Sequence, residues 1–321
     1  MKKLLNTLYV TSGNRYLSLD GENVVVLEDK KEVGRIPLHN LQTIVTFGYT
    51  GASPALMGAC AQRNIDLSFM SGNGRFLARV TGEVRGNVTL RKQQYRISEK
   101  KEESVAIARN FILGKVYNSR WILERASRDY ALRLDVEKIK KKSAFLAESL
   151  GKIRKCETPE ELLGLEGEAA SVYFSVFDEL ILQQKEEFYF HGRNKRPPLD
   201  NVNAMLSFAY SLLAGMCGAA LEAVGLDPYV GFFHTDRPGR MSLALDLMEE
   251  FRGIMADRFV LTLINKRKTF LSAWQSKKQE TIKHPYLDEK IEWGMAPYVQ
   301  SMLLARYLRG DLDEYPPFFW K

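Results

Sequence analysis

One histidine and several acids stand at spacings that suit a divalent metal ion. His234 ends the hydrophobic run GLDPYVGFFH, and the segment SLALDLMEEFR, which begins at Ser242, predicts a helix with acids among its leucines. Asp246 and Glu249 share one face of that helix because side chains at i and i+3 are neighbours, and Glu250 is a weaker third candidate. Imidazole and carboxylate groups together can bind a divalent cation. The pattern therefore indicates metal-dependent chemistry on a phosphodiester.

A further acid lies upstream in the segment LGLEGEAASVYF. Glu166 recurs at helical spacing with Ala169, Tyr173 and Phe177, so it belongs to the apolar stripe of a predicted helix. A bare carboxylate on such a stripe is costly unless it is paired or bound to a metal. The alternative, an acid favoured by the helix dipole, suits the glutamates of the first turn better. Glu166 thus joins the candidate site residues.

Basic side chains near these acids suit an anionic substrate. Arg237 and Arg240 fall in the loop between the histidine and the helix, and guanidinium groups bind phosphate bidentately. The segment HGRNKRPP supplies three more DNA-binding candidates: Arg193, Lys195 and Arg196. Taken singly, each charge is also explained as solvated surface. Together they suit contact with a nucleic-acid backbone.

The composition limits this interpretation only loosely. The sequence has 321 residues, is 45% hydrophobic and 26% charged, and carries a formal net charge of +7. This excess of cations permits an anionic partner without requiring one. Three separated cysteines without a CxxC pair argue against a zinc knuckle and favour a reducing, cytoplasmic setting. We find no stretch of about 20 apolar residues and expect no membrane span.

Two parts of the chain differ in their patterns. Residues 1–80 predict short strands, with a hairpin signal at Asp20-Gly21, where the turn needs a positive φ, and one helix near residues 54–63. This part is predicted to be a β-rich dimerisation domain. A glycine-containing, charged segment at residues 81–92 is a candidate hinge.

From residue 93 onward the segments are long and carry apolar residues at helical spacing. The predicted helices span residues 102–132, 136–150, 158–189, 201–224, 242–265 and 288–308. The final segment, RGDLDEYPPFFWK, is too rich in proline for a helix, and we expect it to pack on this chain or on a partner. The sequence therefore predicts an α+β fold: a small N-terminal β-rich domain followed by a larger all-helical, metal-binding catalytic domain over residues 93–321.

Three runs of the sequence, in this order, resemble a known family. The runs LLGLEGEAASVYF, PPLDNVNAMLSFAYSLL and GLDPYVGFFHTDRPGRMSLALDLMEEFR together resemble the CRISPR-associated integrase of spacer acquisition. The ending RGDLDEYPPFFWK is similar to the branch found with type I-C systems. The resemblance covers almost the whole chain, including the order of a small β domain and a helical catalytic domain.

The resemblance implies a metal-dependent DNA endonuclease and integrase. In that family a glutamate, a histidine and a later acid bind one Mn²⁺ or Mg²⁺ ion, and the matching positions are Glu166, His234 and Glu249. Asp246 matches a second acid of the same helix, so the closer third ligand stays open between Asp246 and Glu249. The implied reaction joins the 3′-hydroxyl of a short double-stranded DNA fragment to a phosphodiester of the CRISPR repeat. The implied partners are a second copy of the chain, bound through the β domain, and a small companion adaptation protein.

Two other functions are compatible with the same residues. A metal-dependent nuclease of branched or single-stranded DNA would use the same site without joining strands. A non-catalytic DNA-binding scaffold would need the basic residues but not the acids. Strand-transfer products separate the integrase from the nuclease, and the effect of Glu166→Ala separates both enzymes from the scaffold.

Overall fold

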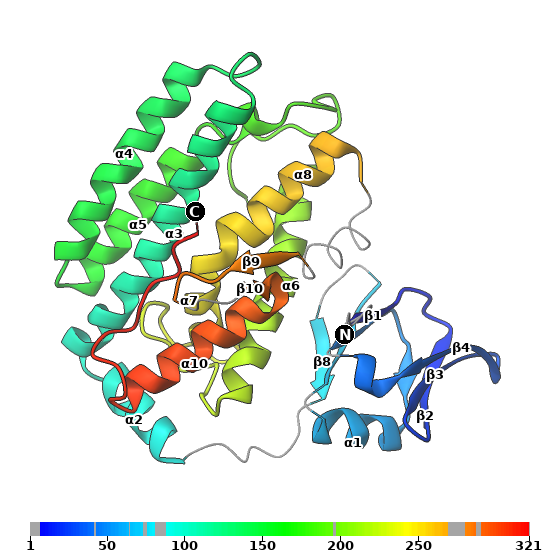
Figure 1. Cartoon of the computed structure of the whole chain (residues 1–321). Coiled ribbons are helices and arrows are strands. Elements are labelled where there is room, and N and C mark those ends of the chain that lie inside the picture. Colours follow the sequence, from blue (N-terminus) through cyan, green and yellow to red (C-terminus); the bar gives the residue numbers. More distant parts are fainter. Residues whose placement is uncertain are drawn as a thin grey trace. The chain divides into compact units, whose positions relative to one another are not determined.

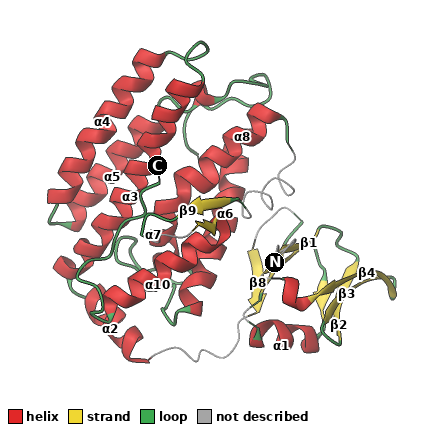
Figure 2. Cartoon of the chain, in the orientation of Figure 1, coloured by secondary structure: helices red, strands yellow, loops and turns green. Residues whose placement is uncertain are grey.

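The computed structural model divides the chain into two compact units, Met1–Arg85 and Gly86–Lys321 (Figure 1). The residues described are 7–41, 43–63, 65–72, 76–80, 88–194, 197–268, 280–286 and 290–320. Strands dominate the first unit and helices the second (Figure 2). The α+β fold predicted from the sequence is therefore confirmed.

Two four-stranded sheets and one helix build the N-terminal unit. The first sheet has the order β1-β5-β7-β8, with bounds Thr7–Val10, Thr43–Phe47, Asp66–Met70 and Phe76–Val80. The second has the order β4-β3-β2-β6, with bounds Lys31–Pro37, Asn23–Glu28, Arg15–Asp20 and Gly51–Ala52. The helix α1, Pro54–Gln62, is capped by the Ser53 side chain, which accepts a hydrogen bond from the Leu56 N–H.

The predicted hairpin of this unit is present. Strands β2 and β3 pair antiparallel, with Asp20 opposite Asn23, and Gly21 in the turn has a φ of 55°. Glycine adopts this left-handed conformation without the steric cost that a side chain brings. Apolar residues from both sheets and α1 form the core, among them Leu17, Ile44, Leu56 and Leu67.

Long helices form the second unit (Figure 1). They are α2 (Val88–Ser98), α3 (Lys101–Asp129), α4 (Val136–Lys155), α5 (Pro159–Phe174), α6 (Asn201–Ala223), α7 (Ser242–Phe251), α8 (Arg258–Lys266) and α10 (Ala296–Leu308). A short antiparallel hairpin, β9 (Thr281–Lys283) with β10 (Lys290–Glu292), lies between α8 and α10 along the chain. Because α3 packs against α4, α5 and α7, it connects the helices that carry the predicted acids.

Two predicted helices are too long. The helix predicted over 158–189 ends at Phe174. Phe177 and Ile181 beyond it are buried in irregular chain, so the apolar pattern continues past the last helical residue. The helix predicted over 242–265 is interrupted by a π-helical turn, Arg252–Asp257, between α7 and α8. Such turns insert one residue into a helix and are frequent at functional sites.

Two further boundaries differ from the prediction. The last helix begins at Ala296 rather than 288, because Pro297 suits the first turn of a helix but not its interior. Residues 88–92 of the candidate hinge belong to α2, and residues 81–87 lie outside the described residues. The apolar stripe of α2 is short and lies among polar residues, so the sequence pattern did not indicate this helix. The buried apolar residues of the stripe include Leu90 and Ile97.

One described helix is long and apolar enough to cross a membrane, by length and composition alone. α6 has 23 residues, and its most apolar window has a mean hydropathy of 1.6. Half of that window is buried inside the protein, where α6 packs against α7 and α10. Its apolar residues are therefore explained by packing within the helical unit.

Candidate active site

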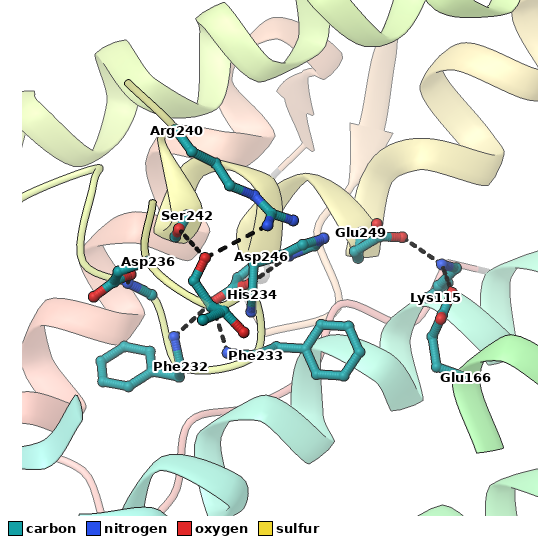
Figure 3. A network of polar contacts seen from close by, with 12 residues as sticks. Lys115, Glu166, Phe232, Phe233, His234, Asp236, Arg240, Ser242, Asp246 and Glu249 are labelled. Atoms are coloured by element: carbon teal, nitrogen blue, oxygen red, sulfur yellow. Dashed lines mark hydrogen bonds and ion pairs between the residues drawn. The ribbon is translucent and has the colours of Figure 1, made fainter. Parts of the chain in front are cut away.

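The loop that carries His234 is held by the buried carboxylate of Asp246. Asp246 Oδ2 accepts hydrogen bonds from the backbone N–H groups of Phe232 at 2.7 Å and Phe233 at 3.0 Å. Its Oδ1 accepts a bond from the His234 N–H at 2.9 Å. Asp246 is fully buried on α7, and these bonds draw the loop onto that helix (Figure 3). Asp246 therefore positions the loop and the histidine.

The imidazole of His234 is bonded to the same carboxylate. His234 Nδ1 lies 2.7 Å from Asp246 Oδ1. Because the carboxylate is an acceptor that already serves three backbone N–H groups, Nδ1 carries a proton and donates it. In the neutral imidazole, the lone pair of Nε2 is then available. A histidine whose first ring nitrogen is bonded to a carboxylate is the common arrangement of a metal-binding imidazole.

Gly231 allows the loop to pass directly over the start of α7. A Cβ at this position would lie 2.8 Å from Asp246 Oδ2 and 2.8 Å from Ser242 Cβ. Carbon atoms do not approach neighbours this closely, so any side chain would push the loop away from the carboxylate. The geometry of the His234 loop therefore depends on a glycine here.

A backbone carbonyl of the preceding loop caps the start of α7. The N–H groups of Leu243 and Ala244 donate to the Pro228 carbonyl at 3.0 and 3.2 Å. The Ser242 hydroxyl instead donates to the Thr235 carbonyl at 3.3 Å. Because the loop folds back onto the helix, its backbone carbonyl satisfies N–H groups that a serine side chain otherwise serves.

A lysine ammonium lies between the two other predicted carboxylates. Lys115 on α3 forms ion pairs with Glu166 on α5 and Glu249 on α7, with 2.7 Å between Lys115 Nζ and Glu249 Oε2 (Figure 3). The three side chains are 9%, 17% and 5% exposed. Two carboxylates in such a dry place repel each other unless a cation lies between them. The fold thus brings Glu166 and Glu249 to one cation position.

Glu249 faces a second cation. Arg252 Nη1 lies 3.2 Å from Glu249 Oε1 and 3.4 Å from Oε2. Burial alone would raise the pKa of Glu249, but the charges of Lys115 and Arg252 outweigh burial and lower the pKa to about 2. Glu249 is therefore a permanent anion at neutral pH.

These donors fit a hard divalent cation, although they do not surround one point. Among the residues that the structure describes, no group of three or more His, Cys, Asp or Glu side chains stands at metal-binding spacing. The place between Glu166 and Glu249 suits a cation, because the Lys115 ammonium lies there. Two carboxylates with the Nε2 of His234 are donors that Mg²⁺ or Mn²⁺ accepts. Asp246 accepts the hydrogen bonds of the His234 loop, whereas Glu249 lies beside the Lys115 ammonium.

The predicted DNA-binding cations of the loop lie near the surface. Arg237 is exposed, whereas Arg240 is half-buried and donates to the Thr235 carbonyl at 3.5 Å. Lys195 and Arg196 lie outside the described residues. Both arginines therefore lie on the loop that follows His234, and their side chains are at least partly accessible to solvent.

Arg193, also predicted to bind DNA, is turned into the helical unit. Its guanidinium donates to Asn203 Oδ1 at 2.7 Å and to Ser207 Oγ at 3.1 Å, both on α6. It also lies 5.2 Å from the centre of the Tyr210 ring. Through the bonds of Nη1 and Nη2, Arg193 braces the preceding segment against that helix.

Two cations of the site were missed in the sequence. Lys115 stands among the buried residues Ile112 and Val116 of α3. A lysine on an apolar stripe needs a carboxylate partner, so its position in the sequence could have indicated a buried ion pair. Arg252 follows Glu249 at i+3, the spacing of an ion pair on one helix.

Comparison with known proteins identifies the family. A strand-rich unit followed by a helical unit is the fold of a CRISPR-associated protein family: the family model described as "CRISPR associated protein Cas1" matches residues 8–291. The chain belongs to the Cas1 family.

Curated relatives match over the whole chain. "CRISPR-associated endonuclease Cas1 1" of Chlorobaculum tepidum is 46% identical over 343 residues, and "CRISPR-associated endonuclease Cas1 2" of Rhodospirillum rubrum is 49% identical over 347 residues. Each alignment covers 100% of both proteins. The names of these relatives support a nuclease-type enzyme linked to CRISPR systems.

Solved structures share the fold at lower identity. A casposase bound to an integration product has a TM-score of 0.80 at 22% identity, covering 99% of this chain and 95% of that one. A Cas1 protein from Thermotoga maritima has a TM-score of 0.77 at 21% identity, covering 98% and 99%. A Cas6-RT-Cas1–Cas2 complex has a TM-score of 0.75 at 20% identity, covering 98% of this chain and 36% of that one.

Proposed function

We propose that this chain is a metal-dependent DNA endonuclease and integrase that inserts short double-stranded DNA fragments into a CRISPR repeat. The observation that carries the proposal is the convergence of Glu166 and Glu249 on one cation, with His234 oriented by Asp246 beside them. Family membership supports it, because the whole-length relatives are named endonucleases. The fold shared with a casposase bound to an integration product agrees with strand joining.

The proposed reaction is a transesterification at phosphorus. The 3′-hydroxyl oxygen of the incoming fragment forms a bond to a phosphorus of the repeat, and the bond from that phosphorus to the repeat's own 3′ oxygen breaks. The attacking hydroxyl loses a proton and the leaving oxygen gains one, so one phosphodiester replaces another and no energy carrier is needed. A bound Mg²⁺ or Mn²⁺ would stabilise charge on the phosphoryl oxygens.

The chain's own residues have distinct parts in this proposal. Glu166, Glu249 and the Nε2 of His234 hold the metal. Asp246 fixes the tautomer and direction of the imidazole through the bond to Nδ1. Arg252 keeps Glu249 ionised and in place. Asp246 and Arg252 thus lie on the same helix and π-helical turn as Glu249 and support the two proposed ligands His234 and Glu249.

DNA and protein partners follow from the same reading. Arg237 and Arg240, on the loop after the histidine, would bind backbone phosphates. The similar fold in a Cas1–Cas2 complex supports a small companion adaptation protein. We also propose that the β-rich unit, Met1–Arg85, joins two copies of the chain into a homodimer. The expected setting is the cytoplasm.

A strand-transfer assay tests the proposal. Purified protein is mixed with a labelled double-stranded fragment bearing free 3′ ends and with a supercoiled plasmid carrying the repeat, in Mn²⁺ or in EDTA. Glu166→Gln is the test variant and Glu168→Gln the control, because Glu168 is exposed on the same helix. We expect label on the plasmid only with Mn²⁺, in the wild type and in Glu168→Gln.

The products separate the alternatives. Nicked plasmid without joined label would indicate the nuclease of branched or single-stranded DNA. Joining by Glu166→Gln at the wild-type rate would reject the site. DNA binding without a metal-dependent product in any variant, with the companion protein added, would indicate the non-catalytic scaffold.

A further inference from the structure

The ammonium of Lys115 occupies the place that the proposed metal needs. It reaches Glu166 on α5 and Glu249 on α7 from a third helix, α3. Its side chain is only 9% exposed, so the contacts are not a solvated surface pair. Exposed ion pairs contribute little to stability, whereas removal of one partner from a buried pair leaves an uncompensated charge.

Glu166 and Glu249 have as many cations in contact as they have charges. Glu166 and Glu249 contribute two negative charges, and Lys115 and Arg252 contribute two positive charges. Arg252 pairs with Glu249, whereas Lys115 pairs with both carboxylates, so Lys115 is the cation that they share. A divalent ion entering between the carboxylates would meet this ammonium at close range, where like charges repel strongly.

We propose that Lys115 is the built-in counter-ion of the metal site: its ammonium holds Glu166 and Glu249 together in the metal-free protein, and a divalent cation must displace it to bind. The inference rests on the proposed function, because it takes these two carboxylates as metal ligands. It makes Lys115 a positioning residue that keeps α3, α5 and α7 assembled without metal. The affinity for the metal then depends on how strongly the Lys115 ammonium competes with it for the two carboxylates.

The test compares the wild type with Lys115→Met, which keeps the length of the side chain but removes the charge. After EDTA treatment and its removal, Mn²⁺ is titrated by calorimetry, and thermal melts are recorded with and without Mn²⁺. We expect Lys115→Met to bind Mn²⁺ about tenfold more tightly or better, because its carboxylates have lost their internal partner. Its metal-free melting temperature should fall by about 10 °C, and saturating Mn²⁺ should restore most of that loss.

Two controls separate this role from general packing. Lys185→Met removes an exposed ion pair with Asp178, 2.9 Å between Lys185 Nζ and Asp178 Oδ2, and should change neither the melting temperature nor the affinity for Mn²⁺. In the double variant Lys115→Met/Glu166→Gln, one carboxylate is neutral and Glu249 still has Arg252. The double variant should regain most of the metal-free stability that Lys115→Met loses.

The outcomes separate this inference from the proposed function. If the wild type binds Mn²⁺, Glu166→Gln does not, and Lys115→Met binds no more tightly than the wild type, the counter-ion role is rejected and the metal site stands. If neither the wild type nor any variant binds Mn²⁺, both proposals fail. If Lys115→Met does not fold without metal, the double variant Lys115→Met/Glu166→Gln decides. A double variant that also fails to fold without metal overturns the inference.

Discussion

Two adjacent glutamates of α7 are equally buried and have opposite electrostatic surroundings. Glu249 is 4% exposed and Glu250 is 0% exposed. Glu249 faces the ammonium of Lys115 and the guanidinium of Arg252, and its pKa falls to about 2. Burial raises the pKa of Glu250 to about 8, and its hydrogen-bond donors only partly oppose that rise. Burial therefore does not decide the charge of a carboxyl group; the charge of its neighbours does.

Neutral donors surround Glu250. Its Oε2 accepts hydrogen bonds from Gln300 Nε2 at 3.0 Å and from the Tyr315 hydroxyl at 2.9 Å. Its Oε1 is 3.4 Å from the backbone nitrogen of Phe318. None of these groups carries a positive charge, so they cannot offset the cost of an ionised carboxylate as fully as two cations do. Glu250 thus joins α7 to α10 and to the final segment of the sequence.

The final segment, which the sequence predicted to pack on this chain or on a partner, packs on this chain. Asn118 of α3 donates to the carbonyls of Phe318 and Glu250 at 2.8 and 2.7 Å, and its Oδ1 accepts from the Trp320 N–H at 2.9 Å. One buried amide therefore links α3, α7 and this segment. Glu250 thus makes structural contacts, whereas Asp246 and Glu249 make the contacts of the candidate site.

Replacing each glutamate by glutamine gives the largest expected contrast. Glu249→Gln removes the charge that faces Lys115 and the proposed metal, so strand transfer should fall by about 100-fold or more. Glu250→Gln resembles the neutral carboxyl group already present at pH 7, so its strand transfer should stay within about twofold of the wild type. Initial rates in Mn²⁺, with circular dichroism as a folding check, measure the difference. Equal losses in the two variants would mean that α7 acts only as a scaffold.

The second prediction concerns the loop that carries His234. Gly231→Ala places a methyl group against Asp246 Oδ2 and should displace the His234 loop. We expect strand transfer to fall by about tenfold, as when other groups that orient a metal ligand are disturbed. Gly215→Ala is the matched control, because a Cβ at this position of α6 meets no atom within 4 Å. If both variants are fully active, the close approach at Gly231 does not hold the histidine.

Local patterns in the sequence were sufficient for most of the fold. The Asp20-Gly21 turn and the alternating strands beside it predicted the β2–β3 hairpin, because a turn conformation and a two-residue period are local properties. The apolar period of 242–265 continued through the π-helical turn, which depends on packing and cannot be read from spacing. The end of α5 at Phe174 could not be read from spacing either, because buried aromatic residues continue at helical spacing beyond it.

The candidate site was predicted in its acids and histidine but not in its cations. Helical spacing placed Asp246 and Glu249 on one face, yet it did not distinguish the loop-holding carboxylate from the one beside Lys115. That distinction depends on contacts across helices, such as the ion pair between α3 and α5. Arg193 shows the same limit, because its partners on α6 are set by the tertiary fold.

A pH series sharpens the comparison further. The folded pKa of Glu250, about 8, is above its ordinary value of 4.5. Its neutral form therefore contributes stability that is complete below pH 4.5 and is lost as the pH rises through 8. In EDTA, Glu250→Gln should match the wild type near pH 5 and exceed its unfolding free energy by a few kcal/mol at pH 9. Stability curves that stay parallel across this range would contradict the raised pKa.

The smallest effect is expected from the Tyr315 hydroxyl, which donates a hydrogen bond to Glu250. Tyr315→Phe removes the bond to Glu250 Oε2 and the acceptor that Gln300 Nε2 uses at 3.0 Å. A single buried hydrogen bond contributes about 1 kcal/mol, so the melting temperature should fall by about 2–4 °C while strand transfer is unchanged. Tyr286→Phe is the control, because its hydroxyl donates to the Pro317 carbonyl from an exposed position and its loss should change the melting temperature less. A loss of strand transfer in Tyr315→Phe at full stability would show that the contacts of Glu250 also serve the reaction, and the contrast between Glu249 and Glu250 would have to be abandoned.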